Sequence, residues 1–369
     1  MTASELAGRV SAARAAMRER DLDALLVFGP ENIYYLVGLN HQGYFAFTLL
    51  ILPADGQPLL VTRAMERVTV ANQTPGLRHV GFADDEDPAG AVRAALMDAG
   101  LADAVLGAEQ DHMHLPVRVW ERMRALLPGV EWRDGSGIVD ALRIVKSPAE
   151  LECVRRAAAT SRAAMLAGLD AAGPGVNERE IAAEVYRALV LAGSEYPGHA
   201  PLIRSGGLIG EEHSTWHDRV LQAGDRLFIE LSGSVGRYHA PMTRMLVIGG
   251  SAGEPAAVAR EGLDVIASAL RPGVRSGEVY GAWEQAVASR LGRPPTRRHH
   301  CGYSVGIGFP PTWAGGREVV GLRPDGDLVV RQGMVFHLFS WLGDWVQSDT
   351  AIVSERGGEL LTADQRPSV

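Results

Sequence analysis

The second half of the chain begins with a stretch that defines the start of a helix, Lys146-Ser147-Pro148-Ala149-Glu150-Leu151. Ser147 can cap this helix, Pro148 stands in the first turn where no N–H donor is needed, and Glu150 can complete a capping box. The sequence therefore predicts a long helix from Pro148 to about Ala171. Gly173-Pro174-Gly175 ends it, because neither residue type continues a helix.

Two similar blocks of elements follow from this starting point. Asn177 and Glu180 predict a second helix through Leu191 by the same capping chemistry. A β-hairpin is expected next, with strands over residues 226–231 and 244–248. The second block has helices over about 256–270 and 277–291 and strands over 334–339 and 350–353. Two blocks of helix, helix and strand in succession predict a pseudo-duplicated α+β unit.

The first half of the chain alternates helix and strand signals, which is typical of an α/β domain. Buried strands are expected over residues 24–28, 47–52, 59–62 and 104–106, and helices over about 89–99 and 117–127. The periodicity weakens between Leu127 and Val145, where proline and glycine interrupt the pattern. We therefore predict an α/β N-terminal domain over residues 1–138 and an α+β C-terminal domain over residues 139–369.

The composition excludes several classes of function. The 369 residues are 46% hydrophobic and 22% charged, and 36 Lys and Arg against 44 Asp and Glu give a net charge of -8, without a basic stripe that could follow a nucleic acid. No apolar run approaches the roughly 18 residues of a membrane-spanning helix, and residues 1–20 lack the apolar block of a signal peptide. Cys153 and Cys301 are too few for a disulfide framework. We expect a cytoplasmic protein that binds neither nucleic acid nor membrane.

Glu230 is an unusual residue because it lies inside an apolar strand, Leu227-Phe228-Ile229-Glu230-Leu231. Strand alternation places it on the face opposite Ile229 and Leu231, and an ionised carboxylate inside a strand requires partners. One interpretation is a salt bridge to Arg244 on the neighbouring strand. The other is a catalytic carboxylate, and the sequence leaves both open.

Two histidines close together suggest a second candidate site. His213 and His217 have the i, i+4 spacing of metal ligands on a helix, and Glu211 and Glu212 could supply oxygen. The segment lacks helical periodicity, so a surface or hydrogen-bonding loop histidine is the other interpretation. The same alternative applies to His239, His299, His300 and His337.

A third candidate is a serine in the pattern G-x-S-x-G, which forms the nucleophile elbow of some hydrolases. Ser251 lies between an expected strand and an expected helix, as that motif requires, whereas Ser304 does not. A glycine-rich strand-to-helix loop is also common without catalysis, and no partner residues for Ser251 are evident. We keep a serine hydrolase as an outlying hypothesis.

Several motifs occur along the chain in a characteristic order. They are Asn32-Ile33-Tyr34-Tyr35-Leu36-Val37-Gly38, the Lys146 to Leu151 stretch, the His213 segment, Gly224-Asp225 followed by Glu230, and Gly333-Met334-Val335-Phe336. Their order resembles that of the creatinase, aminopeptidase P and prolidase superfamily. The resemblance covers nearly the whole chain and implies an N-terminal α/β domain, a C-terminal "pita-bread" domain with pseudo-twofold halves, and a homodimer.

The resemblance also bears on metal binding. The metallopeptidases of this superfamily hold two metal ions with two Asp, one His and two Glu. At those positions this chain has Glu230, Pro241, Tyr303, Phe339 and Ser348, with Asp349 one residue away. Pro and Phe cannot bind a metal, and Tyr and Ser are poor ligands. We therefore expect no metal and no cofactor, whereas His213 falls where the superfamily keeps a catalytic histidine.

Among metal-free members, the chain is most similar to the ectoine hydrolase group. That group implies hydrolysis of a C–N bond in a small cyclic amidine, with Glu230 pairing with the cationic N–C–N group and attacking its carbon, and His213 moving protons. The alternatives are a creatinase-type guanidine hydrolase and a non-catalytic ligand-binding protein. The shared strings are residues 229–233, 237–241, 302–308, 310–313 and 333–337.

A small zwitterionic amidine or guanidine needs further contacts besides Glu230 and His213. Arg244, Tyr303 and His300 are candidates for its carboxylate, and Trp216 and Trp313 for its ring face. The shared strings also contain His239 and His337, which complete the predicted substrate site together with Tyr44 and Asp349. The last two lie where the chain departs from the group, in Asn40-His41-Gln42-Gly43-Tyr44-Phe45 and Gln347-Ser348-Asp349.

Overall fold

The computed structural model describes residues 2–295, 298–316 and 319–363. These residues form two compact units. The first unit runs to Arg143 and includes Gly315 and Gly316, and the second contains the remainder from Ile144 onward. The predicted boundary at residue 138 lies five residues before the observed one, which is at residue 143.

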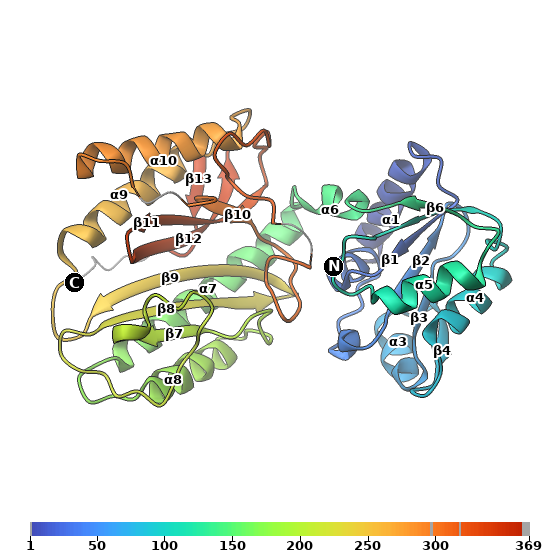
Figure 1. Ribbon diagram of the computed structural model, residues 1–369, viewed down its shortest axis with the longest axis horizontal. Helices are drawn as coiled ribbons and strands as arrows, with labels where there is room; N and C mark the ends of the chain where they lie inside the picture. The colour runs from blue at the N-terminus through green and yellow to red at the C-terminus, as the bar shows by residue number, and fades with distance from the viewer. Residues whose placement is uncertain (1, 296–297, 317–318, 364–369) are drawn as a thin grey trace. The chain divides into compact units, whose positions relative to one another are not determined.

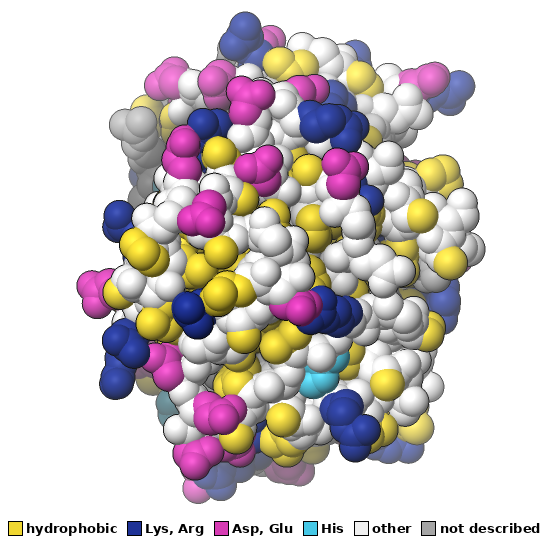
Figure 2. Space-filling view, turned by 90° about the vertical axis from the view of Figure 1, so that its right-hand side faces the viewer, with side chains coloured by type: hydrophobic (Ala, Val, Ile, Leu, Met, Phe, Trp, Pro, Cys, Tyr) yellow, Lys and Arg dark blue, Asp and Glu magenta, His cyan; other side chains and the backbone are white. Residues whose placement is uncertain are grey.

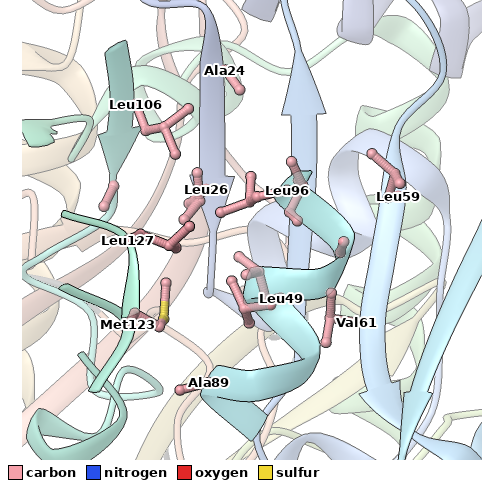
Figure 3. Close-up of a cluster of buried hydrophobic side chains, with 14 of the residues drawn as sticks. Ala24, Leu26, Leu49, Leu59, Val61, Ala89, Leu96, Leu106, Met123 and Leu127 are labelled. Carbon is pink, nitrogen blue, oxygen red and sulfur yellow. The ribbon is translucent and has the colours of Figure 1, made fainter. Parts of the chain in front are cut away.

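The first unit is a mixed six-stranded sheet with helices, in the strand order β4-β3-β2-β1-β5-β6. Leu26, Leu49 and Leu96 belong to its buried core, where α4 lies across the sheet (Figure 3). The strands are β1 (Ala24–Val27), β2 (Leu49–Pro53), β3 (Leu59–Arg63), β4 (Arg78–Phe82), β5 (Val105–Ala108) and β6 (Glu131–Asp134). The helices are α1 (Ala3–Arg18), α2 (Pro30–Val37), α3 (Arg67–Gln73), α4 (Pro88–Asp98), α5 (Val117–Leu126) and α6 (Ile138–Arg143).

Helix α6 extends the first unit beyond the predicted boundary because its polar side chains bond to α2. The Asn32 amide donates to Asp140 Oδ2 at 3.1 Å, and Arg143 Nη1 donates to Asn32 Oδ1 at 2.5 Å. These long-range bonds leave no trace in hydrophobic periodicity, so the sequence does not show that α6 belongs to the first compact unit.

The second unit contains a seven-stranded sheet in the order β10-β11-β12-β9-β8-β7, with β13 also paired to β12. Helix α7 packs on β8 and β9 with α8 beside it, and α9 packs on β11 and β12 with α10 beside it (Figure 1). The predicted pseudo-duplicated arrangement is confirmed. Its helices are α7 (Pro148–Ala171), α8 (Glu178–Leu191), α9 (Gly253–Ala269) and α10 (Ser276–Leu291). Its strands are β7 (Leu202–Ser205), β8 (Arg226–Val235), β9 (Tyr238–Val247), β10 (Gly302–Ser304), β11 (Val335–Leu342), β12 (Trp345–Ser354) and β13 (Gly357–Leu360).

Both predicted helix starts are confirmed as capping boxes. Ser147 Oγ accepts the Glu150 N–H at 3.3 Å, and Glu150 Oε2 accepts the Ser147 N–H at 2.7 Å. Asn177 and Glu180 form the same reciprocal arrangement at the start of α8. These caps satisfy N–H groups that the first turn leaves unpaired, so they position α7 and α8 against the sheet.

The sequence analysis missed strand β7, which pairs antiparallel with β8. Its four residues, Leu202 to Ser205, include a buried arginine, Arg204. A charged residue in so short a segment weakens the apolar pattern by which a strand is predicted. The pairing of β7 with β8 places Arg204 on the strand next to that of Glu230.

The sequence predicts a surface without a basic stripe. On the face shown in Figure 2, basic and acidic side chains alternate with apolar ones and form no continuous basic band. Among the described residues, no helix is both long and apolar enough to cross a membrane.

Candidate active site

One face of the second sheet points away from the helices. Leu227, Ile229 and Leu231 of β8 belong to the core formed with α7 and α8. Because successive strand residues point to opposite faces, Phe228 and Glu230 lie on the other face of the sheet. The predicted orientation of Glu230, opposite Ile229 and Leu231, is therefore confirmed.

The strand register aligns five residues in one row across this free face. Leu202 of β7 pairs with Glu230 of β8, which pairs with Thr243 of β9. Thr243 pairs with Ser348 of β12, which pairs with Phe339 of β11. Directly paired residues of neighbouring strands project to the same face. The row therefore combines one carboxylate with hydroxyl and apolar side chains.

A cavity of about 540 Å³ lies on this face. Its wall is rich in aromatic rings, with Glu230, Glu212, Arg204 and Arg298 as its charged side chains. Such a cavity has the size of a small-molecule site. The lining residues are His199, Leu202, Arg204, Glu212, His213, Phe228, Glu230, Arg298, His299, His300, Tyr303, Thr312, Trp313, Ala314, Val319, Phe339 and Trp341.

Glu230 is half-buried in the cavity wall and accepts no hydrogen bond from any described residue. Burial raises the pKa of this carboxyl to about 7, an increase that Arg204 opposes and Glu212 reinforces. A raised pKa in a cavity is a common property of functional carboxylates. The geometry thus leaves both carboxylate oxygens available to a ligand.

The salt bridge between Glu230 and Arg244 that the sequence suggested is wrong. Arg244 pairs across the strands with Ile229 and so projects to the opposite face from Glu230. Its Nη2 donates to Asp349 Oδ1 at 2.9 Å, and its Nη1 donates to the carbonyls of Thr243 and Ser348, each at 2.8 Å. Arg244 and Asp349 are both buried and lie outside the cavity lining.

His213 lines the cavity from the loop between β7 and β8 and is exposed to solvent. His217 does not line it, and its backbone N–H donates to Glu178 Oε2 at 2.8 Å. The loop is not helical, so the i, i+4 spacing does not bring the two histidines to one helix face. Of the two histidines, only His213 lines the cavity.

A chain of hydrogen bonds supports one wall of the cavity. The Trp313 Nε1–H donates to the Tyr303 hydroxyl at 2.8 Å, and that hydroxyl lies 3.2 Å from His337 Nδ1. His337 Nε2 lies 2.7 Å from Ser348 Oγ. Burial lowers the pKa of His337 and raises that of Tyr303, so both are neutral. His337 therefore lies behind Tyr303, whereas Tyr303 and Trp313 line the cavity.

The remaining predicted substrate residues have different locations. His300 lines the cavity, and burial lowers its pKa to about 4, so its ring is neutral. His239 is buried outside the lining, where its Nε2 accepts the Gly198 N–H at 2.8 Å. Trp216 packs edge-on against Tyr186 with the α7 and α8 core.

Tyr44 and Ser251 are not among the residues that line the cavity. Tyr44 belongs to the first unit, where its hydroxyl donates to the Leu39 carbonyl at 3.0 Å. Ser251 is exposed in the loop before α9, and its Oγ accepts the Gly253 N–H at 3.4 Å. Neither contact suggests an activated nucleophile.

Sequence reasoning did not identify Arg204, Phe228 and Trp341 as site residues, although all three line the cavity. Arg204 carried a usable signal, because it is a charged residue inside an apolar segment, as Glu230 is. Phe228 and Trp341 carried none, since an aromatic residue in a strand is ordinarily part of a core.

The side chains present do not fit a metal ion. Of the five positions at which the resemblance places ligands, Glu230 alone offers a carboxylate, and Pro241 and Phe339 offer no donor atom. Ser348 Oγ is engaged with His337, and Asp349 is paired with Arg244. Within residues 2–295, 298–316 and 319–363, no group of three or more His, Cys, Asp or Glu side chains could hold a metal.

Comparisons with known proteins cover both units. Residues 9–145 match the Creatinase/Prolidase N-terminal domain, and residues 152–348 match Metallopeptidase family M24. The ectoine hydrolase of Halomonas elongata is 26% identical over 386 residues, covering 98% of this chain and 96% of the relative. The probable dipeptidase PepE of Mycobacterium tuberculosis is 26% identical over 367 residues, covering 95% of this chain and 92% of the relative.

A solved structure shows the fold. The recombinant prolidase of Thermococcus sibiricus superposes with a TM-score of 0.84 at 19% identity, covering 97% of each chain. The predicted fold class, an α/β N-terminal domain followed by a pita-bread domain, is therefore confirmed. The chain belongs to metallopeptidase family M24, with a creatinase/prolidase N-terminal domain before its pita-bread domain.

Proposed function

We propose that the protein is a metal-independent hydrolase that cleaves a C–N bond in a small cyclic amidine. The supporting comparison is a relative that is named for the hydrolysis of ectoine. A hydrolase is the function that the family and these two relatives support. The observation that carries the finer proposal is Glu230, a half-buried carboxylate without a hydrogen-bond partner among the described residues, in an aromatic cavity without a metal-binding donor set.

An amidinium group suits this cavity for two reasons. Its positive charge complements Glu230, and its flat N–C–N plane can stack on rings such as Phe339 and Trp341. Its carbon is electron-poor because two nitrogens withdraw electrons from it, so nucleophilic attack does not require a metal to polarise the bond.

The proposed reaction uses Glu230 as the nucleophile and His213 as the proton-transfer group. A Glu230 oxygen adds to the amidinium carbon, and one C–N bond breaks as His213 protonates the departing nitrogen. Water, deprotonated by His213, then attacks the same carbon and displaces the Glu230 carboxylate. The products are an amide and an amine, one water is consumed, and both side chains return to their starting states.

A panel of substrates tests this function. We expect the metal-stripped protein to consume ectoine in an NMR assay, and Glu230→Gln and His213→Ala to abolish turnover. His217→Ala is the matched control, because His217 is an exposed histidine on the same loop outside the cavity lining. Turnover of creatine but not ectoine would indicate a guanidine hydrolase, and cleavage of Xaa-Pro dipeptides would refute the proposal.

We further propose a homodimer, as the family resemblance implies. In the first unit, Phe45, Met65 and Val68 are 81%, 67% and 60% exposed, which is unusual for apolar side chains of this size. A partner subunit that covers them would remove this apolar surface from water. Sedimentation equilibrium tests the proposal, and a monomer at micromolar concentration would contradict it.

A further inference from the structure

Arg204 is a buried cation whose orientation is fixed by its neighbours. It is 2% exposed, its Nε donates to the Ile209 carbonyl at 3.2 Å, and its guanidinium carbon lies 3.7 Å from the centre of the Phe228 ring. Its Nη1 is buried and has no hydrogen-bond partner. Arg204 also lines the cavity, so a positively charged group with an unused hydrogen-bond donor forms part of the cavity wall.

Arg204 forms no close ion pair within the described part of the chain. Glu230 lines the same cavity and interacts with its charge only at longer range. The register explains their separation, because Leu202 stands opposite Glu230, and Arg204 stands two residues farther along, opposite Phe228. Side chains in such a diagonal arrangement lie roughly 7–8 Å apart at their bases. Each charge therefore lacks a direct counter-ion.

The other arginine of the cavity is already engaged. Arg298 Nη1 donates to Glu212 Oε1 at 3.1 Å, and its guanidinium carbon lies 3.9 Å from the Trp341 ring centre. Arg244, which the sequence suggested for the substrate carboxylate, is paired with Asp349 outside the lining. Arg204 is thus the cavity cation best placed to receive an anion.

We propose that Arg204 binds the carboxylate of a zwitterionic substrate while Glu230 binds its cationic N–C–N group. This inference rests on the proposed function and narrows its substrate class to small amidinium carboxylates whose two charges are separated by a few bonds. A buried cation and a half-buried anion that lack direct counter-ions both gain when one ligand supplies the two opposite charges. An amidine without a carboxylate would leave Arg204 unpaired.

Binding measurements on two ligands test the inference. The ligands are ectoine and its decarboxylated analogue, the methyl-tetrahydropyrimidine that lacks only the carboxylate. Isothermal titration calorimetry in a His213→Ala background avoids turnover and keeps both charged residues. We expect ectoine to bind at least about tenfold more tightly than the analogue, since one charged hydrogen-bonded contact contributes about that factor.

In Arg204→Gln, the preference for ectoine should disappear, while the affinity for the analogue stays within about threefold. The analogue thus reports whether the variant still forms the cavity. Arg226→Gln is the matched control, because Arg226 is an arginine of β8 outside the cavity lining, and it should retain the preference. If Arg204→Gln does not fold, Arg204→Lys should reduce the preference at least about threefold, because an ammonium cannot bind a carboxylate in the two-pronged manner of a guanidinium.

A preference that is unchanged in Arg204→Gln, or in Arg204→Lys where the first variant does not fold, would overturn the inference. If the wild-type protein still hydrolyses ectoine in that case, the proposed function stands while the role of Arg204 falls. If neither ligand binds to the His213→Ala protein and the wild-type protein does not consume ectoine, both the inference and the amidine class are refuted.

Discussion

Glu230 and Arg204 line one cavity from neighbouring strands, carry opposite charges, and form no ion pair with each other. In most buried sites such charges would be paired, because burial of an unpaired charge is costly. Their separation leaves space for a ligand that carries both charges. The arrangement costs the folded protein stability, and this cost can be measured.

Replacing Glu230 by Gln should stabilise the protein at high pH. The folded-state pKa of about 7 lies above the ordinary value of 4.5, so the folded state favours the protonated carboxyl. The penalty for ionisation therefore grows as the pH rises from 4.5 to about 7 and remains constant above that. Thermal unfolding should show Glu230→Gln more stable than wild type at pH 8 and equal to it near pH 4. A lower melting temperature at pH 8 would argue against this.

The activity should depend on the ionisation of the same carboxyl. Because Glu230 must be ionised to bind a cation and attack it, kcat/KM for ectoine should fall about tenfold per pH unit below pH 7. His217→Ala should show the same profile, since His217 lies outside the cavity lining. A profile that is flat between pH 5 and about 7.5 would exclude Glu230 as the group that titrates.

The hydrogen bonds behind the cavity wall should contribute to stability. Tyr303→Phe leaves the Trp313 N–H and one nitrogen of His337 without their partner, which should cost about 1–3 kcal/mol of unfolding free energy. Tyr196→Phe is the matched control, because the Tyr196 hydroxyl is buried without a partner and its removal should be neutral or stabilising. Urea unfolding of both variants provides the comparison, and equal losses would contradict the network.

Arg244 and Asp349 should prove to be structural residues. Both are buried, and breaking such a pair leaves an uncompensated charge, so Asp349→Asn should lose about 3 kcal/mol. Asp264→Asn, in the exposed pair with Arg260, should change stability by less than about 1 kcal/mol. Substrate affinity of folded Asp349→Asn should match wild type. Loss of affinity without loss of stability would restore the substrate role that the sequence suggested.

The elements most accurately predicted from the sequence are those with local signals. Ser147 and Asn177 mark helix starts by their own chemistry, and the β8–β9 hairpin follows from alternation around a glycine-containing turn. The faces of Glu230 and Ile229 also follow from alternation. These features depend on residues a few positions apart, so one sequence suffices to find them.

Features that depend on long-range pairing could not be predicted. The predicted Glu230–Arg244 salt bridge is wrong because Glu230 pairs with Thr243 and not with Arg244. A shift of one residue in the register moves a side chain to the other face of the sheet. Trp216 and Trp313 looked equivalent in the sequence, yet one packs on Tyr186 and the other lines the cavity. Arg204 stands inside an apolar segment, which is a usable signal, but β7 is only four residues long. Its place in the site depends on the pairing of β7 with β8, which local periodicity does not reveal.

The central claim is that Glu230 is the reacting carboxylate and that no metal takes part. The most direct measurement is the initial rate of ectoine consumption by metal-stripped protein, followed by NMR with and without added Mn²⁺, beside Glu230→Gln. We predict equal rates with and without the metal and a loss of at least about a thousandfold in Glu230→Gln, the range that removal of a nucleophile produces. A rate that appears only after Mn²⁺ is added, or that persists in Glu230→Gln, would contradict the claim.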